Sequence, residues 1–170
     1  MRQDKDSVEM AFVALGSNLG ESGDIINRAI ERLQSLSTAP LLRSSLIKTR
    51  PVDCPPGSPP FVNAVVGLSP VSGETPQLLL RRLRQLEKEF GRRPKKIHNE
   101  PRVLDLDLIA FGSRIVNSPE LVLPHPRAHL RRFVLEPLNE IAPDIVLPGQ
   151  KKSVRELLLT LSASHGDRPD

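Results

Sequence analysis

The fold of this chain can be worked out from one stretch, Pro101-Arg102-Val103-Leu104-Asp105-Leu106-Asp107-Leu108-Ile109. Apolar and charged side chains alternate through it, and a period of two is typical of a β-strand with one buried face. The leucines would face the core, whereas Asp105 and Asp107 would project together from the opposite face, with their Cα atoms ~7 Å apart. We therefore predict a strand over 103–111 that carries two neighbouring carboxylates.

The segments that precede this strand predict three more strands and two helices, from the spacing of their apolar residues. The predicted strands cover 8–15, 42–49 and 61–68, and the predicted helices cover 24–36 and 75–90. Ser22 or Asp24 can cap the first helix, and Thr75 before Pro76 can cap the second. The order β-α-β-β-α-β is typical of the ferredoxin-like α/β (α+β) sandwich, in which two helices cover one face of the sheet. The other face is then left to loops or to a ligand.

Further elements follow the acidic strand. Short strands around 115–116 and 121–123 predict a hairpin, and Ser153 with Glu156 forms the capping box of a last helix that ends near Leu161. We expect a single domain over 1–170, with an ordered core over about 8–162 and a flexible tail over 163–170.

Composition limits the classes of protein to consider. The chain has 170 residues, a net charge of +4, five Phe and no Trp or Tyr. A mild positive charge suits an anionic ligand such as a nucleotide, whereas base-stacking binders of nucleic acids need aromatic faces that are scarce here. The single cysteine, Cys54, excludes an internal disulfide, and no apolar run approaches the ~20 residues of a membrane-spanning helix. We expect a cytoplasmic monomer that binds small molecules, and neither a nucleic acid nor a membrane.

Two carboxylates side by side on a sheet repel each other unless a cation lies between them. Mg²⁺ prefers oxygen ligands and commonly combines one or two carboxylates with phosphate oxygens and water. Arg102 and the basic stretch 92–96 lie just before the acidic strand, so this region favours a site for Mg²⁺ and a polyphosphate. The alternative is a solvated acidic face.

The turn Gly16-Ser17-Asn18-Leu19-Gly20 lies between the first predicted strand and the first predicted helix. It matches neither the Walker A pattern nor the G-x-G-x-x-G pattern of phosphate-binding loops. We favour a tight turn that caps the helix over a phosphate-binding loop.

Six segments, in order, resemble the signature of 6-hydroxymethyl-7,8-dihydropterin pyrophosphokinases. Residues 102–108 resemble its P-R-T-L-D-L-D-[IL] element, and residues 14–20 resemble its A-L-G-S-N-[LM]-G element. The other similar segments are 48–52, 61–65, 86–92 and 124–138. The resemblance covers nearly the whole chain. It implies an enzyme of folate biosynthesis that transfers pyrophosphate from ATP to the hydroxymethyl group of 6-hydroxymethyl-7,8-dihydropterin and releases AMP.

The resemblance also implies roles for particular residues. Asp105 and Asp107 would hold two Mg²⁺ ions and, with Arg92 and Arg102, would be catalytic. The nucleotide would be bound by Arg84, Glu87, Arg102, His125 and Arg131. The pterin ring would lie between Phe61 and Phe133 and would be bound by Asn63 and by the segment that contains Thr49, Pro51 and Asp53. Without the resemblance, the two Phe would be assigned to the core, whereas a structural role in its loop and a binding role would be equally open for His125.

The loop 94–100 departs from the family pattern R-x-R-x-x-R-W-G-P-R. The position of its Trp is Asn99, the Gly before Pro101 is Glu100, and one of its Arg is Pro94. These differences predict a slower enzyme or a differently organised lid. Three alternatives stay open: a family member that binds ATP and pterin with little turnover, a nucleotidyltransferase, and a non-catalytic regulatory or RNA-binding module.

Overall fold

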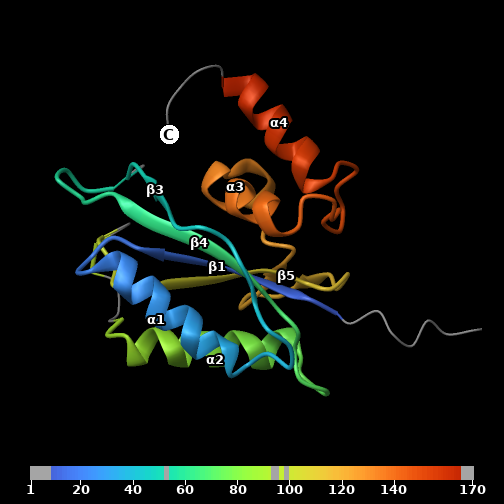
Figure 1. Cartoon of the computed structure of the whole chain (residues 1–170), viewed down its shortest axis with the longest axis horizontal. Helices are drawn as coiled ribbons and strands as arrows, with labels where there is room; N and C mark the ends of the chain where they lie inside the picture. The colour runs from blue at the N-terminus through green and yellow to red at the C-terminus, as the bar shows by residue number, and fades with distance from the viewer. Residues whose placement is uncertain (1–8, 52–53, 93–95, 98–99, 166–170) are drawn as a thin grey trace, which may run out of the picture.

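The computed structural model describes residues 9–51, 54–92, 96–97 and 100–165 of the chain. Its centre is an antiparallel sheet of β1 (Ala11–Ser17), β2 (Leu42–Arg43), β3 (Ile47–Thr49), β4 (Phe61–Leu68) and β5 (Asp105–Phe111). The strands follow the order β2-β4-β1-β5, and β3 also pairs with β4 (Figure 1). Each helical crossover therefore joins two strands that have a third strand between them, which is the split βαβ arrangement. The predicted ferredoxin-like fold class is confirmed.

Two helices, α1 (Ser22–Gln34) and α2 (Pro76–Glu89), cover one face of this sheet (Figure 1). Each buries an apolar stripe, which includes Ile26 and Leu33 on α1 and Leu83 on α2. The Thr75 Oγ1 atom accepts a hydrogen bond from Leu78 N at 3.2 Å. The predicted cap of α2 is confirmed.

The start of α1 differs from the prediction. The residue before the helix is Glu21, whose side chain makes no capping bond to the described residues. Ser22 is the first helical residue, and its hydroxyl accepts a hydrogen bond from Ser17 Oγ at 3.0 Å. The expectation that Ser22 or Asp24 caps α1 is wrong, because the turn places Ser22 against the end of β1 and its hydroxyl bonds there.

The strand predicted over 42–49 is divided into β2 and β3. Between them, Ser44 Oγ accepts a hydrogen bond from Val65 N at 2.9 Å, so a side chain replaces a main-chain partner in the ladder. The next residue turns away from the sheet, because Ser45 N and Oγ both donate to the Glu140 carboxylate. By contrast, β4 has the predicted bounds.

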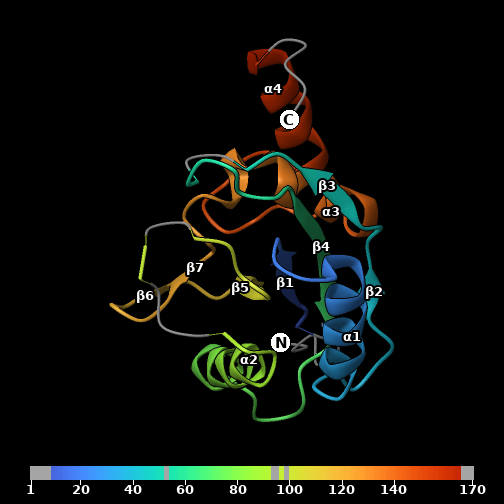
Figure 2. The same ribbon diagram turned by 90° about the vertical axis from the view of Figure 1, so that its left-hand side faces the viewer.

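The opposite face of the sheet is covered by α3 (Arg132–Ile141), against which η1 (Ala128–Leu130) and α4 (Val154–His165) pack; Figures 1 and 2 show α4 on the far side of α3 from the sheet. We expected loops or a ligand there, and helix α3 was not predicted. Its Val134, Leu135 and Leu138 pack in a second core that includes Phe12 and Val65 of the sheet. This core covers only part of the face, and the ends of the strands near Gly16 and Asp105 lie outside it.

The last helix begins as predicted. Ser153 Oγ accepts a hydrogen bond from Glu156 N at 3.2 Å, and Glu156 Oε1 accepts one from Ser153 N at 3.0 Å. The capping box is therefore confirmed, although α4 continues past Leu161 to His165. Residues 166–170, which belong to the predicted tail, lie outside the described residues.

The predicted hairpin consists of β6 (Val116–Asn117) and β7 (Val122–Leu123) and lies beside β5 (Figure 2). Among the residues that the structure describes, no helix has the length and apolar character needed to span a bilayer.

Candidate functional site

Three strands place Asn63, Gly16 and Asp105 in one row across the sheet. Gly16 of β1 pairs with Asn63 of β4 on one side and with Asp105 of β5 on the other. Adjacent strands lie ~4.8 Å apart, so Asn63 and Asp105 are separated by ~10 Å. A Cβ atom at Gly16 would lie 3.2 Å from Asn63 Oδ1 and 3.7 Å from Phe61 Cδ1. The absence of a side chain at Gly16 therefore leaves free space on this face of the sheet. We call this space the floor of the site; Asn63 and Phe61 lie on one side of it and Asp105 lies on the other.

Asp105 is bonded by two arginines from the segment between α2 and β5. Arg92 Nη1 donates to Asp105 Oδ1 at 2.8 Å, and Arg102 Nη1 donates to Asp105 Oδ2 at 2.9 Å. Arg92 also pairs with Glu87, a buried carboxylate of α2. The structure therefore brings together three of the four residues that we predicted to be catalytic.

Asp107, the fourth, lies two residues along β5 on the same face. Burial and the neighbouring Asp105 raise the pKa of Asp107 to about 6, although Arg84 and Arg131 act to lower it. A carboxylate that is desolvated beside another acid gains most from a bound cation. No group of three or more His, Cys, Asp or Glu that could hold a metal occurs among the described residues. Mg²⁺ fits this pair of acids, because it can take its remaining ligands from phosphate and water.

Arg84 and Glu87 of α2 meet the outer edge of β5. Main-chain groups at the edge of a sheet need partners outside the ladder. Glu87 Oε2 accepts a hydrogen bond from Leu106 N at 3.0 Å, and Arg84 Nη1 donates to Leu106 O at 2.9 Å. Arg84 also bonds Glu87 Oε1 at 2.7 Å. These two predicted nucleotide-binding residues thus hold the acidic strand in place.

His125 is brought to the site by an irregularity of β5. Phe12 of β1 pairs with Ala110 of β5, but the next residue, Val13, pairs with Leu108. Ile109 is therefore an extra residue in β5 that has no pairing partner in β1. The Ile109 carbonyl accepts a hydrogen bond from His125 N at 2.8 Å. The bulge therefore directs the loop that carries His125 back to the acidic strand.

The environment of His125 also determines its protonation. His125 Nδ1 accepts a hydrogen bond from Arg127 N at 3.1 Å, which leaves Nε2 to carry the proton of the neutral ring. Burial, together with the charges of Arg131 and Arg127, lowers the pKa of His125, and Asp105 acts in the opposite direction. The ring is therefore neutral near physiological pH, with an N–H that can bind an anionic oxygen.

The predicted pterin-binding residues come from β3, β4 and α3. Asn63 Nδ2 donates to Thr49 Oγ1 at 2.7 Å, and Phe61 lies on the same face of β4 as Asn63. The Arg131 guanidinium lies over the Phe133 ring, 5.4 Å from its centroid. Pro51 is half-buried after β3. Asp53 lies outside the described residues, as do positions 94 and 99 of the loop that departs from the family pattern.

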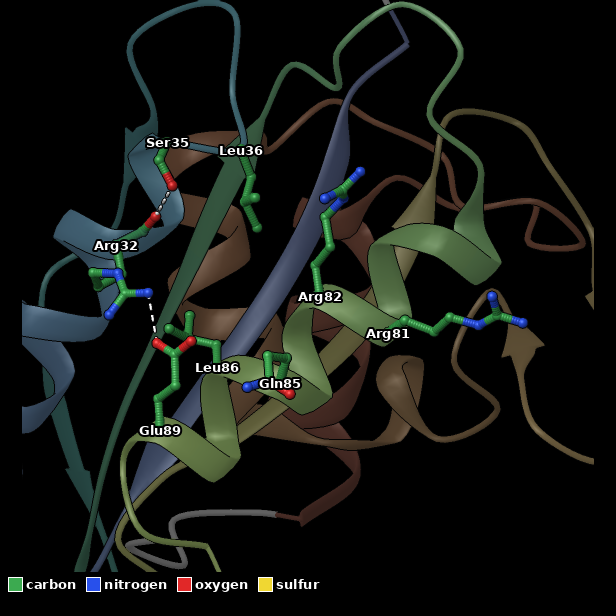
Figure 3. Close-up of a pocket in the computed structure, with 8 residues that line it drawn as sticks. All are labelled: Arg32, Ser35, Leu36, Arg81, Arg82, Gln85, Leu86 and Glu89. Atoms are coloured by element: carbon green, nitrogen blue, oxygen red, sulfur yellow. Dashed lines mark hydrogen bonds and ion pairs between the residues drawn. The ribbon is translucent and has the colours of Figure 1, made fainter.

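A pocket lies between α1 and α2, on the other side of the sheet from Asp105 and Asp107 (Figure 3). It is lined by Arg32, Ser35, Leu36, Arg81, Arg82, Gln85, Leu86 and Glu89. Glu89 is paired with Arg32 at 2.5 Å, so a cation there would meet arginines rather than an acidic pair. We therefore place the functional site on the face that carries Asp105 and Asp107.

The turn predicted over 16–20 contains two residues whose contribution the sequence does not reveal. Gly16 belongs to β1 and forms the floor described above, and Asn18 is 1 % exposed and bonds to two distant segments. The G-S-N motif marks the turn as special, but it does not say what the asparagine contacts. Arg131 and Phe133 were assigned to the site from the family resemblance alone, because local sequence patterns did not predict α3, at whose start they lie.

Residues 12–143 match the family model described as 7,8-dihydro-6-hydroxymethylpterin-pyrophosphokinase (HPPK). This chain belongs to the HPPK family. The predicted resemblance is therefore confirmed over most of the chain.

Curated relatives agree with this assignment. The 2-amino-4-hydroxy-6-hydroxymethyldihydropteridine pyrophosphokinase of Haemophilus influenzae is 37 % identical over 83 % of this chain and 86 % of its own length. The enzyme of the same name from Methylorubrum extorquens is 34 % identical over 93 % of this chain and 97 % of its own. A folic acid synthesis protein of Pneumocystis carinii is 39 % identical over 82 % of this chain, which spans only 18 % of that protein.

Solved structures of fused HPPK-DHPS proteins share the fold. A Plasmodium falciparum HPPK-DHPS superposes with a TM-score of 0.74 and 13 % identity over 96 % of this chain. A second HPPK-DHPS, solved with substrates, has a TM-score of 0.70 and 12 % identity over 92 % of this chain. This chain spans 47 % and 44 % of those two chains, so the likeness concerns their HPPK-type fold alone.

Proposed function

We propose that this chain transfers the pyrophosphate group of ATP to the hydroxymethyl group of 6-hydroxymethyl-7,8-dihydropterin and releases AMP. The hydroxymethyl oxygen attacks the β-phosphorus, the bond from that phosphorus to the α,β-bridging oxygen breaks, and the hydroxyl proton passes to solvent. The row of Asn63, Gly16 and Asp105 carries this proposal. It separates an amide that can bind the pterin from the acidic pair by about the length of the pterin.

The phosphate side of the site is rich in donors. Asp105 and Asp107 would hold two Mg²⁺ ions, which supply positive charge that neutralises the phosphates. Arg92 and Arg102, which donate to Asp105, would stabilise the negative charge that develops on the departing AMP. Arg131 and the Nε2–H of His125 would bind further phosphate oxygens. Arg84 and Glu87 would position the nucleotide next to the strand that they hold.

The pterin side combines aromatic faces with a small set of polar atoms. Because Asn63 Nδ2 bonds Thr49, its Oδ1 faces Gly16 as an acceptor for an N–H of the pterin. Phe61 and Phe133 would stack on the two faces of the ring. The segment with Thr49, Pro51 and Asp53 would complete the site. We further propose that residues 1–170 fold as a unit and that the protein is cytoplasmic and monomeric, with these small molecules as its partners.

Product analysis tests this function. With ATP, Mg²⁺ and the pterin, we expect AMP and the pterin diphosphate, and a loss of turnover of at least ~1,000-fold in Asp105→Ala and in Asp107→Ala. The matched control is Asp144→Ala, an exposed aspartate paired with Arg155 at 3.1 Å on the surface, which should keep native turnover. Release of pyrophosphate instead of AMP would show a nucleotidyltransferase, and pterin binding without turnover would show the degenerate alternative.

A further inference from the structure

Asn18 connects three segments that are far apart in the sequence. It follows β1, and its main-chain N–H donates to Arg102 O at 3.1 Å. Its side-chain Oδ1 accepts a hydrogen bond from Arg102 N at 2.8 Å, and its Nδ2 donates to Pro59 O at 3.4 Å. Asn18 is therefore bonded to the residue that precedes the acidic strand and to the segment that precedes β4.

These contacts are not those of a helix cap. The N-cap position of α1 is Glu21, three residues later, and Asn18 is buried rather than turned towards the first amides of the helix. Both ends of its amide are used by main-chain groups of other loops. The carboxamide matches them in a specific way, because it offers an acceptor to Arg102 N and a donor to Pro59 O at once.

Each contact lies next to a proposed substrate-binding group. Arg102, which is held through its N–H and C=O, reaches Asp105 with its guanidinium at 2.9 Å. Pro59 is followed by Pro60 and then by Phe61, the first residue of β4. Because two successive prolines have a restricted φ, they transmit a displacement at Pro59 to Phe61 instead of absorbing it.

We propose that Asn18 is a positioning residue, which ties the segment carrying Arg102 to the segment leading to Phe61 and so sets the phosphate side and the pterin side of the site together. This proposal rests on the proposed function. Misplacement of reacting groups by ~1 Å can slow an enzyme by up to ~100-fold. The loss of this link is therefore expected to change catalysis more than stability.

Two substitutions distinguish the two arms of this link, which are the side-chain hydrogen bonds of Asn18 with Arg102 N and with Pro59 O. Asn18→Asp keeps the acceptor for Arg102 N but puts an oxygen against the Pro59 carbonyl, so the KM for the pterin should rise about tenfold while kcat stays within about threefold of native. Asn18→Ala removes both side-chain hydrogen bonds and leaves the main-chain bond to Arg102 O. In this variant kcat should also fall at least about tenfold. Asn27→Ala, an exposed asparagine of α1, is the matched control and should leave kcat and both KM values unchanged.

Hydrogen exchange measures the link without relying on activity. Asn18→Ala should speed amide exchange in the segments 102–104 and 61–63, whereas Asn18→Asp should speed it in 61–63 alone. If the native chain releases no AMP, the proposed function fails, and exchange alone then decides whether Asn18 holds the two segments. Native kinetics in Asn18→Ala, or exchange that changes in neither segment, would overturn the proposal. Equal loss of kcat in the two variants would overturn the assignment of separate arms.

Discussion

At the scale of single residues, the two acids of β5 have opposite surroundings although they share one face. Asp105 accepts from two arginines, at 2.8 and 2.9 Å. Asp107 is desolvated next to Asp105, and the pKa of its carboxyl is raised from 3.8 to about 6. The protein therefore compensates the carboxylate of Asp105 with two arginines, whereas burial and the neighbouring acid disfavour the charge of Asp107.

The stability of amide variants should reveal this difference. Because the folded state holds the Asp107 proton more tightly than the unfolded state, the free energy of unfolding falls as the pH rises from about 4 through about 6. Asp107→Asn removes this loss and should raise the free energy of unfolding by about 1–3 kcal/mol near pH 8, with the gain shrinking towards zero near pH 4. Urea unfolding without Mg²⁺ measures it. Asp105→Asn, which weakens the contacts of Asp105 with Arg92 and Arg102, should destabilise the chain at pH 8. A gain in that variant as well would contradict our account.

At the scale of elements, the registers of β4, β1 and β5 determine which side chains meet. A shift of one residue in either pairing would move Asn63 or Asp105 to the face that packs against α1 and α2. Partners outside the ladder hold β5 in this register, since Glu87 and Arg84 bond Leu106 and the His125 N–H bonds Ile109. The site therefore depends on contacts at the edge of the sheet as well as on the sheet itself.

Gly16→Ala tests whether the space over Gly16, between Asn63 and Asp105, must stay free of a side chain. The added Cβ would lie 3.2 Å from Asn63 Oδ1, so the amide has to move by a few tenths of an ångström. We expect the KM for the pterin to rise about tenfold, equivalent to ~1.4 kcal/mol, while the KM for ATP stays within about twofold. Steady-state kinetics with each substrate varied in turn measure this. Gly23→Ala, where a Cβ on α1 meets open space, is the control and should not change either KM. Equal changes in both KM values for Gly16→Ala would argue against a pterin-specific floor.

At the scale of the whole molecule, the proposed site takes its groups from every layer. The acids come from the sheet, Arg84 and Glu87 from the α1–α2 layer, and Arg131 and Phe133 from the start of the α3–α4 layer. A ligand that bonds all three layers stabilises the folded chain as a unit, because binding is linked to global unfolding.

Thermal melting should report this linkage. Mg²⁺ with an ATP analogue that cannot be cleaved, at ~100 times its Kd, adds about 2.7 kcal/mol of stability, or ~5–10 °C in Tm for a domain of this size. EDTA should abolish the shift, and Asp105→Ala should show little of it. An equal rise in Tm for Asp105→Ala would place the metal and nucleotide elsewhere on the protein.

Local patterns in the sequence account for much of the fold. Strict alternation predicts the face shared by Asp105 and Asp107, side-chain chemistry predicts the caps at Thr75 and Ser153, and the motifs predict the family. These features depend on residues within a few positions of one another, so they can be predicted without knowledge of the tertiary structure. Tertiary structure decided the rest. Helix α3 forms although Pro137 lies inside it, because Val134, Leu135 and Leu138 find a core to pack against.

The contacts of Asn18 could not be predicted from the sequence either. Its partners lie 84 and 41 residues away, and a hydrogen bond over such a distance leaves no periodic trace in the chain. Local sequence thus determined which side chains share a strand face or a helix end. Only the packing of distant segments decided which of those faces and ends meet, because that choice depends on the free energy of the whole core.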